Sequence, residues 1–290
     1  MQIRSTERTL IYSSRLQVTL RQRCCKEQQM QKRQEYHLVT EAPGLKASSE
    51  QVERIYQRYR FARQYGVDKD VLEVACGTGM GLGYLAQSAH RVVAGDIDDK
   101  NIALARRYSA TAKDKVQIDA LDAHHLSYPD ESFDLVLLYE AIYYLREPEL
   151  FVGEARRVLR TGGTLIICTV NRDWEDFHPS PYTWKYFSVP QLTGLLGQHF
   201  HQVLVYGGFQ IGEGGLKSSA ISMIKHFALR YHLIPGSLKA RAYLKRLFMG
   251  KLSGLPDMVH DGMAPYHEPE RIPSDQANKG FKILYFVAQK

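Results

Sequence analysis

The chain has 290 residues, enough for one large domain or for one domain with an elaboration. A hydrophobic content of 44% with 24% charged residues is typical of globular proteins, and no apolar run approaches the roughly 20 residues that cross a bilayer. The net charge of +7 permits a nucleic acid, an anionic lipid or an acidic substrate as a partner but selects none of them. The 4 cysteines lack the spacing of a zinc site, a CxxC pair or a disulfide scaffold, so we expect a reducing compartment and no metal.

Residues 1–34 are rich in Arg, Gln, Lys and Ser and contain only a short apolar stretch. They lack the continuous apolar segment of a secretory signal. A basic segment with few acids could direct the protein to an organelle. We favour instead a disordered extension over residues 1–40, or coding sequence that lies upstream of a true start near Met30.

Residues 48–65 predict a helix, because Ser48 or Ser49 can cap it and apolar residues recur at a spacing of three to four. Two tyrosines on this helix, Tyr56 and Tyr59, precede the motif described next. They either pack in the core or cover a bound ligand.

A glycine-rich turn organises the rest of the chain. The apolar strand at 71–75, with Glu73 embedded in it, runs into Cys76-Gly77-Thr78-Gly79, and a helix pattern follows at 80–88. Glycines allow a positive φ and a close approach of a ligand to the main chain. The free N–H groups at the start of the next helix favour an anionic group. The pattern therefore predicts a nucleotide-type site at the carboxyl edge of a parallel sheet.

A second buried strand is predicted at 91–98 and ends in acid, with Asp96 as the candidate ligand. This residue follows Gly79 by roughly the interval at which α/β nucleotide sites place a carboxylate on the ribose hydroxyls. A carboxylate can accept both vicinal hydroxyl groups, and such charge-assisted bonds are stronger than neutral ones. We therefore interpret Asp96 as a ribose ligand rather than a solvated acid at the end of a strand.

Further apolar strands alternate with helical segments, which predicts an α/β fold with a doubly wound, mostly parallel sheet and right-handed crossovers. The strands are expected at 116–119, 133–139, 164–168, 202–206 and 281–288. The core is thus predicted over 41–209 and closes with 281–290. Residues 210–280 are predicted to form a basic helical insertion, with helices at 218–231 and 237–252, since loops of this length usually have structure of their own or a function.

Five motifs in order make the chain resemble the class I S-adenosylmethionine-dependent methyltransferases, in particular those of quinone biosynthesis and related small-molecule enzymes. They are LEVACGTG at 72–79, the strand that ends at Asp96, Asp122-Ala123, FDLV at 133–136 and RVLRTGG at 157–163. Thr161 stands where a proline is common in this family. A nicotinamide enzyme is disfavoured, because Leu82 occupies the position of its third glycine.

The resemblance implies S-adenosylmethionine as cofactor and a Rossmann-like sheet of seven strands with an antiparallel last strand. It also implies a set of cofactor-binding residues, namely Glu73, Ala75, Gly77, Gly79, Asp96, Ile97, Asp122, Ala123 and Tyr139.

The methyl acceptor is less well defined by the sequence. An oxygen nucleophile needs a proton acceptor, whereas an amine or an activated carbon does not. The candidate catalytic residues are Glu140 after the fourth strand and His178 in an aromatic loop after the fifth; His124 and His125 are alternatives that could instead be solvated. The aromatic residues at 174–187 either pack as a lid or line a pocket, which favours an apolar or ring-bearing acceptor and O-methylation.

Residues 217–251 combine basic and apolar side chains and contain no acid. Such a segment could form a substrate lid, lie on an anionic membrane surface or follow a nucleic-acid backbone. No RNA-binding module appears, so nucleic acid is the least favoured partner. We expect a cytoplasmic methyltransferase for a small or lipid-linked molecule, with peripheral membrane contact through 217–251. The alternatives are a non-catalytic S-adenosylmethionine-binding protein whose insertion contacts a partner, and a methyltransferase for RNA or another macromolecule.

Overall fold

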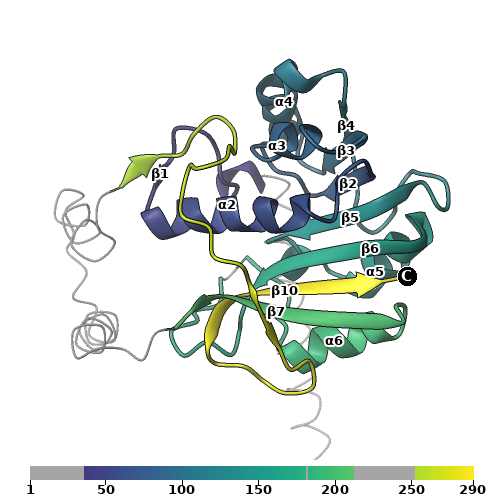
Figure 1. Cartoon of the computed structure of the whole chain (residues 1–290), viewed down its shortest axis with the longest axis vertical. Helices are drawn as coiled ribbons and strands as arrows, with labels where there is room; N and C mark the ends of the chain where they lie inside the picture. Colours follow the sequence, from purple (N-terminus) through teal and green to yellow (C-terminus); the bar gives the residue numbers. More distant parts are fainter. Residues whose placement is uncertain (1–35, 181, 212–251) are drawn as a thin grey trace, which may run out of the picture.

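The computed structural model describes residues 36–180, 182–211 and 252–290. Their main feature is an eight-stranded sheet in the order β4-β3-β2-β5-β6-β10-β7-β9 (Figure 1). In chain order the strands are β2 (Asp70–Val74), β3 (Arg91–Asp96), β4 (Val116–Ala120), β5 (Phe133–Tyr139), β6 (Leu159–Val170), β7 (Gln202–Gln210), β9 (Glu270–Ile272) and β10 (Phe281–Gln289).

Helices cover both faces of this sheet because its strands are apolar on both sides. Along β5, Val136 and Leu138 belong to one core cluster, whereas Leu135 and Leu137 belong to the other. Side chains of α5 (Pro148–Val158) and α6 (Val189–Gly197) complete the first cluster, and those of α2 (Ser49–Arg63), α3 (Leu82–Ala86) and α4 (Asp99–Tyr108) the second. The predicted doubly wound α/β architecture is confirmed.

The sheet has one strand more than expected. Strands β4, β3, β2, β5 and β6 are parallel, and β10 lies antiparallel between β6 and β7, as predicted for the last strand. The prediction of seven strands is wrong because β9 pairs with the free edge of β7. This strand is only 3 residues long, too short to produce a pattern in the sequence.

The described part of the predicted insertion, residues 252–280, is not helical. It contains β8 (Ser253–Gly254), which pairs with β1 (Lys46–Ala47), and β9. Asp261 holds this segment on α2 and α3, because its carboxylate accepts hydrogen bonds from Tyr84 (2.6 Å) and Tyr56 (3.2 Å). The expected helices at 218–231 and 237–252 fall on residues outside the described ones, apart from residue 252, which is not helical.

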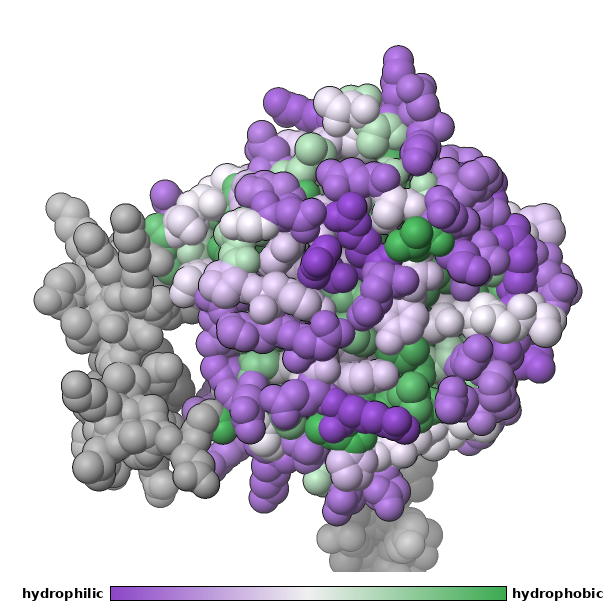
Figure 2. Space-filling view, viewed as in Figure 1, coloured by the Kyte–Doolittle hydropathy of each residue, from purple (hydrophilic) through white to green (hydrophobic). Residues whose placement is uncertain are grey.

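The helix predicted at 48–65 is α2, which crosses in front of the sheet (Figure 1). Ser48 caps it and forms a capping box with Gln51, as such serines commonly do. The face of the molecule in Figure 2 is largely hydrophilic, with its hydrophobic side chains in small groups. Among the described residues, no helix has the length and hydrophobicity to cross a membrane.

Candidate active site

A cavity of about 330 Å³ runs across the carboxyl ends of four neighbouring strands, β4, β3, β2 and β5. Ligands bind in this position in open α/β sheets, and the volume is at the low end of the range for small-molecule pockets. Two further elements line the cavity: α2 and the segment that contains the 3-10 helix η1 (Tyr36–Leu38). The strand order fixes how the cavity is divided, from the end of β4 on one side to the end of β5 on the other.

The glycine turn after β2 has the backbone conformation that its sequence predicts. The φ angles of Gly77 and Gly79 are +56° and +72°, and Ala75 has a φ of +57°. A Cβ atom on Gly77 would lie 2.6 Å from Cγ2 of Thr40, too close for any other residue to fit without movement. Glycine is therefore favoured at position 77 both by its backbone angle and by packing.

Asp96 braces this turn from the end of β3. Its Oδ2 accepts the N–H of Gly77 at 2.9 Å, and its Oδ1 accepts the N–H of Asp98 at 2.9 Å and the amide of Asn101 at 3.2 Å. Burial raises the pKa of Asp96, and these hydrogen bonds oppose the rise. A carboxylate offers about four acceptor positions, so three bonds leave one for a ligand on the cavity side.

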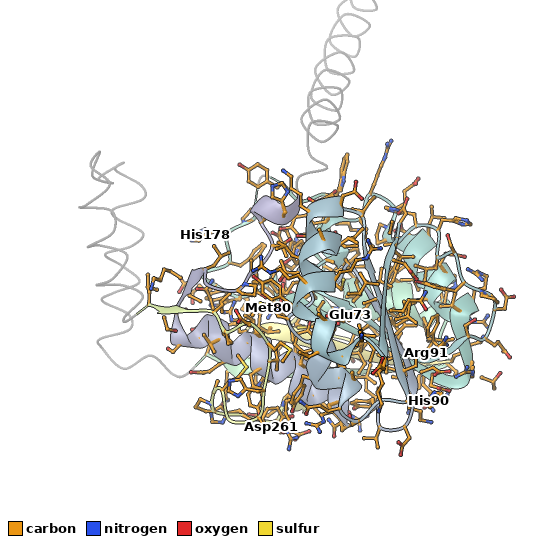
Figure 3. All side chains as sticks on the ribbon, turned by 90° about the horizontal axis from the view of Figure 1, so that it is seen from above. Glu73, Met80, His90, Arg91, His178 and Asp261 are labelled. Atoms are coloured by element: carbon orange, nitrogen blue, oxygen red, sulfur yellow. The ribbon has the colours of Figure 1, made fainter. Side chains whose placement is uncertain are left out.

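Glu73 lines the cavity with 1% of its surface exposed, and its label in Figure 3 lies in the interior of the molecule. The hydroxyl of Tyr59 donates to Oε1 at 2.7 Å, whereas Oε2 has no hydrogen-bond partner. Burial raises the pKa of Glu73 to about 7, while the bond from Tyr59 and the charge of Arg58 lower it. An unsatisfied buried carboxylate oxygen suits a cationic donor such as the ammonium group of an amino acid.

The β4 end of the cavity is lined by Asp122, Ala123 and His124, together with Ile97 after β3. Ile97 is 49% exposed, an unusual state for a large apolar side chain beside a cavity. Asp122 accepts the backbone N–H of His124 at 2.9 Å and lies 2.8 Å from its Nδ1. An apolar surface beside these polar groups is suited to a nucleobase.

The segment before α2 lines the same cavity, although it was predicted to belong to a disordered extension over 1–40. That boundary is wrong, because residues 36–40 pack on the glycine turn. Thr40 accepts a hydrogen bond from Asn101 at 3.2 Å, and the carbonyl of Glu41 accepts one from Thr78 at 2.8 Å. His37 binds the carboxylate of Asp98 through its N–H at 2.9 Å.

The β5 end of the cavity is built from the residues that follow this strand. Tyr139 is 6% exposed, and its hydroxyl donates to the carbonyl of Arg58 at 3.2 Å. Glu140 has a positive φ of 50°, which turns the chain sharply at the cavity wall. The hydroxyl of Tyr143 donates to its Oε2 at 2.8 Å. Burial raises the pKa of Glu140, and the bond from Tyr143 followed by the charges of Arg58 and Arg54 oppose the rise.

The predicted site residues are brought together with few exceptions. Glu73, Ala75, Gly77, Asp96, Ile97, Asp122, Ala123, Tyr139 and Glu140 all line the cavity. Gly79 does not line the wall but shapes the turn that does. His178 is exposed on the loop after β6, at the periphery of the molecule in Figure 3, and is not part of the cavity wall. Within the described residues, no group of acidic, His or Cys side chains could hold a metal ion.

The sequence did not reveal the contribution of the remaining wall residues. Those outside the strand-end motifs include Tyr36, Val39, Thr40, Glu41, Gln51, Arg54, Arg58, Tyr143 and Tyr144. The clearest available signal was the pair Arg54 and Arg58, four residues apart on an amphipathic helix that precedes the glycine turn. Charged side chains on a predicted helix are usually solvated, so this signal was weak.

Comparison with known proteins agrees with this geometry. Residues 72–167, from β2 into β6, match the family model described as a methyltransferase domain. This match shows that residues 72–167 carry a methyltransferase domain, and the sheet order and the glycine turn agree with the class of such domains that uses S-adenosylmethionine as its cofactor. The residues fit this cofactor, since Asp96 retains an acceptor position, Glu73 has an unsatisfied oxygen and Ile97 is exposed beside the β4 end.

Particular relatives are similar over part of their length. A protein named as a probable S-adenosylmethionine-dependent methyltransferase from Mycolicibacterium smegmatis is 35% identical over 133 residues, 44% of this chain and 50% of the relative. A ubiquinone biosynthesis O-methyltransferase from Sinorhizobium medicae is 29% identical over 126 residues, 40% of this chain and 51% of the relative. The chain thus matches about half the length of these relatives.

A solved structure extends the similarity of the fold. The [4+2]-cyclase SpnF superposes with a TM-score of 0.53 and 17% identity, covering 84% of this chain and 83% of that protein. At this identity the likeness concerns the fold alone.

Proposed function

We propose that the protein transfers a methyl group from S-adenosylmethionine to a small molecule. The observation that carries the proposal is the row of carboxylates Glu73, Asp96 and Asp122 on three neighbouring strand ends beside the glycine turn. Each meets a different part of the cofactor: Glu73 the ammonium group, Asp96 a ribose hydroxyl and Asp122 the rim of the adenine. The match of 72–167 to the methyltransferase domain model supports this proposal.

When bound, the cofactor supplies a methyl group on a sulfonium, whose leaving group is already activated. The protein's task is then to position the acceptor and to exclude water. Glu140 lines the cavity beyond β2, on the side away from Asp96 and Asp122, and accepts the proton of the acceptor hydroxyl. Its carboxylate is half-buried, and its raised pKa makes it a better proton acceptor than an exposed glutamate. This arrangement favours O-methylation.

Binding and turnover must be tested separately, since one protein of similar fold is a cyclase and a fold does not establish a reaction. Calorimetry with S-adenosylhomocysteine measures the affinity of the donor half, and absence of binding would falsify the proposal. Formation of S-adenosylhomocysteine from S-adenosylmethionine in the presence of a small-molecule extract measures turnover. Binding without turnover would favour a non-catalytic protein that binds the cofactor.

The second candidate acceptor is a lipid-linked molecule. A cytoplasmic protein that methylates such a molecule would contact the membrane surface peripherally. The feature in its favour is the basic and apolar composition of 217–251, which lies outside the described residues. Flotation with vesicles of phosphatidylcholine, with and without phosphatidylserine, tests this contact at low and high salt. Binding that needs the anionic lipid and weakens with salt supports it, and absence of binding to either vesicle removes it.

A further inference from the structure

The two arginines of α2 that line the cavity lie at different positions along it. Arg54 and Arg58 are one helical turn apart, a separation of about 6 Å along the axis, so they share one face of the helix. The charge of Arg58 opposes the rise that burial causes in the pKa of both Glu73 and Glu140, so Arg58 lies between the two halves. The charge of Arg54 acts on Glu140 and not on Glu73. Arg54 is one turn closer to the start of the helix.

The start of α2 lies over the last strands of the sheet, beyond β5. Glu50 forms an ion pair of 2.8 Å with Lys282 of β10, and the guanidinium of Arg54 stands 5.6 Å from the ring centre of Phe209 in β7. The strand order runs from β5 through β6 to β10 and β7. Arg54 therefore stands on the acceptor side of Glu140, away from the strand ends that form the donor half.

The charges around these arginines are balanced differently. Arg58 forms an ion pair with Glu41, one cation with one carboxylate. Arg54 shares the carboxylate of Glu50 with Lys282, so two cations meet one anion. The second cation is therefore not neutralised by Glu50, and the charge of Arg54 also acts on Glu140, where it opposes the rise in pKa that burial causes.

The guanidinium of Arg54 also has unused hydrogen-bonding capacity. Among the described residues, Glu50 is the acceptor of the one hydrogen bond it donates, through Nη2, and its Nε is buried without a partner. The side chain is 26% exposed and lines the cavity. A guanidinium has five N–H donors in a rigid fork that matches a carboxylate or a phosphate.

We propose that Arg54 binds an anionic group of the methyl acceptor, a carboxylate or a phosphate monoester, while the acceptor atom faces Glu140. This inference rests on the proposed function, because it assumes that the β5 end of the cavity is the acceptor half. Tyr143 donates a hydrogen bond to Glu140 and its ring contacts that of Tyr144, and both tyrosines line the cavity. Aryl compounds that carry an anionic group are therefore suitable probes.

The test uses the full-length protein saturated with S-adenosylhomocysteine and three probes measured by calorimetry: benzoate, benzamide and phenyl phosphate. Benzoate is expected to bind at least about tenfold more tightly than benzamide, the difference of a charge-assisted bond. Arg54→Gln should abolish this preference, and Arg54→Lys should retain part of it. Phenyl phosphate binding more tightly than benzoate would assign the anion as a phosphate monoester; the reverse order would assign a carboxylate.

The matched control is Arg60→Gln. Arg60 lies on the same helix, is 45% exposed, pairs with Asp261 and is not part of the cavity wall. Its replacement should leave the affinity for all three probes within about twofold of the wild type, since a pair on the surface contributes little.

Four results would overturn the inference. Two concern the preference for the anion: equal affinity of the wild type for benzoate and benzamide, or a benzoate preference that survives in Arg54→Gln. The third is absence of binding of any probe at about 10 mM, a concentration that detects even weak affinity, and the fourth is loss of S-adenosylhomocysteine affinity in Arg54→Gln. The last would assign Arg54 to the cofactor. Binding of S-adenosylhomocysteine to the wild-type protein is measured before any probe is added. Absence of this binding would count against the proposed function and not against the role of Arg54.

Discussion

The two halves of the cavity are constructed in different ways. The donor half consists of the ends of β4, β3 and β2, where backbone groups and acids are placed by the topology of the sheet itself. The acceptor half combines the end of β5 with side chains of α2, which lies far from β5 in the sequence, whereas residues 36–41 complete the wall beside the glycine turn. The first can be located from short motifs at regular intervals, whereas the second depends on how helices pack over the sheet.

The largest expected effect separates the two halves by their function. Glu140→Gln removes the proposed proton acceptor while it preserves size and hydrogen bonding. We expect turnover with a hydroxyl acceptor to fall by about 10²–10⁴-fold, the usual contribution of a general base. Affinity for S-adenosylhomocysteine, measured by calorimetry, should stay within about twofold, a change well under 1 kcal/mol. Unchanged turnover would exclude Glu140 as the base.

Tyr143→Phe provides the matched control for Glu140. Burial raises the pKa of Glu140, and the hydroxyl of Tyr143 opposes this rise by donating a hydrogen bond to its carboxylate. Without this bond the pKa of Glu140 should rise further. A base must be deprotonated to act, so the acid limb of the pH–rate profile should move to higher pH in the variant. An unmoved limb would mean that another group titrates.

The second-largest expected effect is on stability: the buried carboxylate of Glu73 in the donor half lowers the free energy of unfolding. Burial raises the pKa of Glu73 from 4.5 to about 7, so the folded protein keeps a proton that the unfolded chain has lost. Stability therefore falls as the pH rises from 4.5 to about 7 and stays lower above that range. Glu73→Gln should relieve this loss, raising the free energy of unfolding above pH 7 by up to about 3 kcal/mol.

Urea unfolding of the cofactor-free protein, at pH values below and above the titration range, measures this difference. The variant and the wild type should have similar midpoints at the acid end and should diverge at the alkaline end. The same substitution should weaken S-adenosylhomocysteine, because an uncharged amide pairs less well with an ammonium group. Equal urea midpoints of the variant and the wild type at both pH values would show that the folded protein does not contain Glu73 as a buried, ionised group.

The third effect tests the ribose ligand. Asp96→Ala should weaken binding of S-adenosylhomocysteine by roughly 1–3 kcal/mol, the cost of losing a charge-assisted partner. The loss should include a contribution from the glycine turn, since Asp96 also holds the N–H of Gly77. Asp99→Ala is the control, because Asp99 is exposed and absent from the cavity wall. Unchanged calorimetric affinity in Asp96→Ala would contradict the ribose assignment.

These residues illustrate what the sequence can and cannot reveal. The position of Asp96 at a strand end follows from its spacing to the glycine turn, but its bond to Gly77 depends on how two neighbouring strands align. The added strand β9 has too few residues to show a pattern. His178 lies in an aromatic loop that resembles a pocket lining by composition, yet composition does not determine on which side of a loop a side chain lies.

The smallest expected effect concerns residues 36–40, which were predicted to be disordered. Thr40 contacts Gly77 through its methyl group, accepts a bond from Asn101 and donates one of 2.8 Å to the carbonyl of Tyr36. Thr40→Ala removes both hydrogen bonds and should weaken S-adenosylhomocysteine by about 0.5–1.5 kcal/mol. Thr40→Ser keeps the hydroxyl and should lose less. If both variants bind S-adenosylhomocysteine as tightly as the wild type does, Thr40 and its segment do not contribute to cofactor binding, and the residues at the strand ends form the donor half without them.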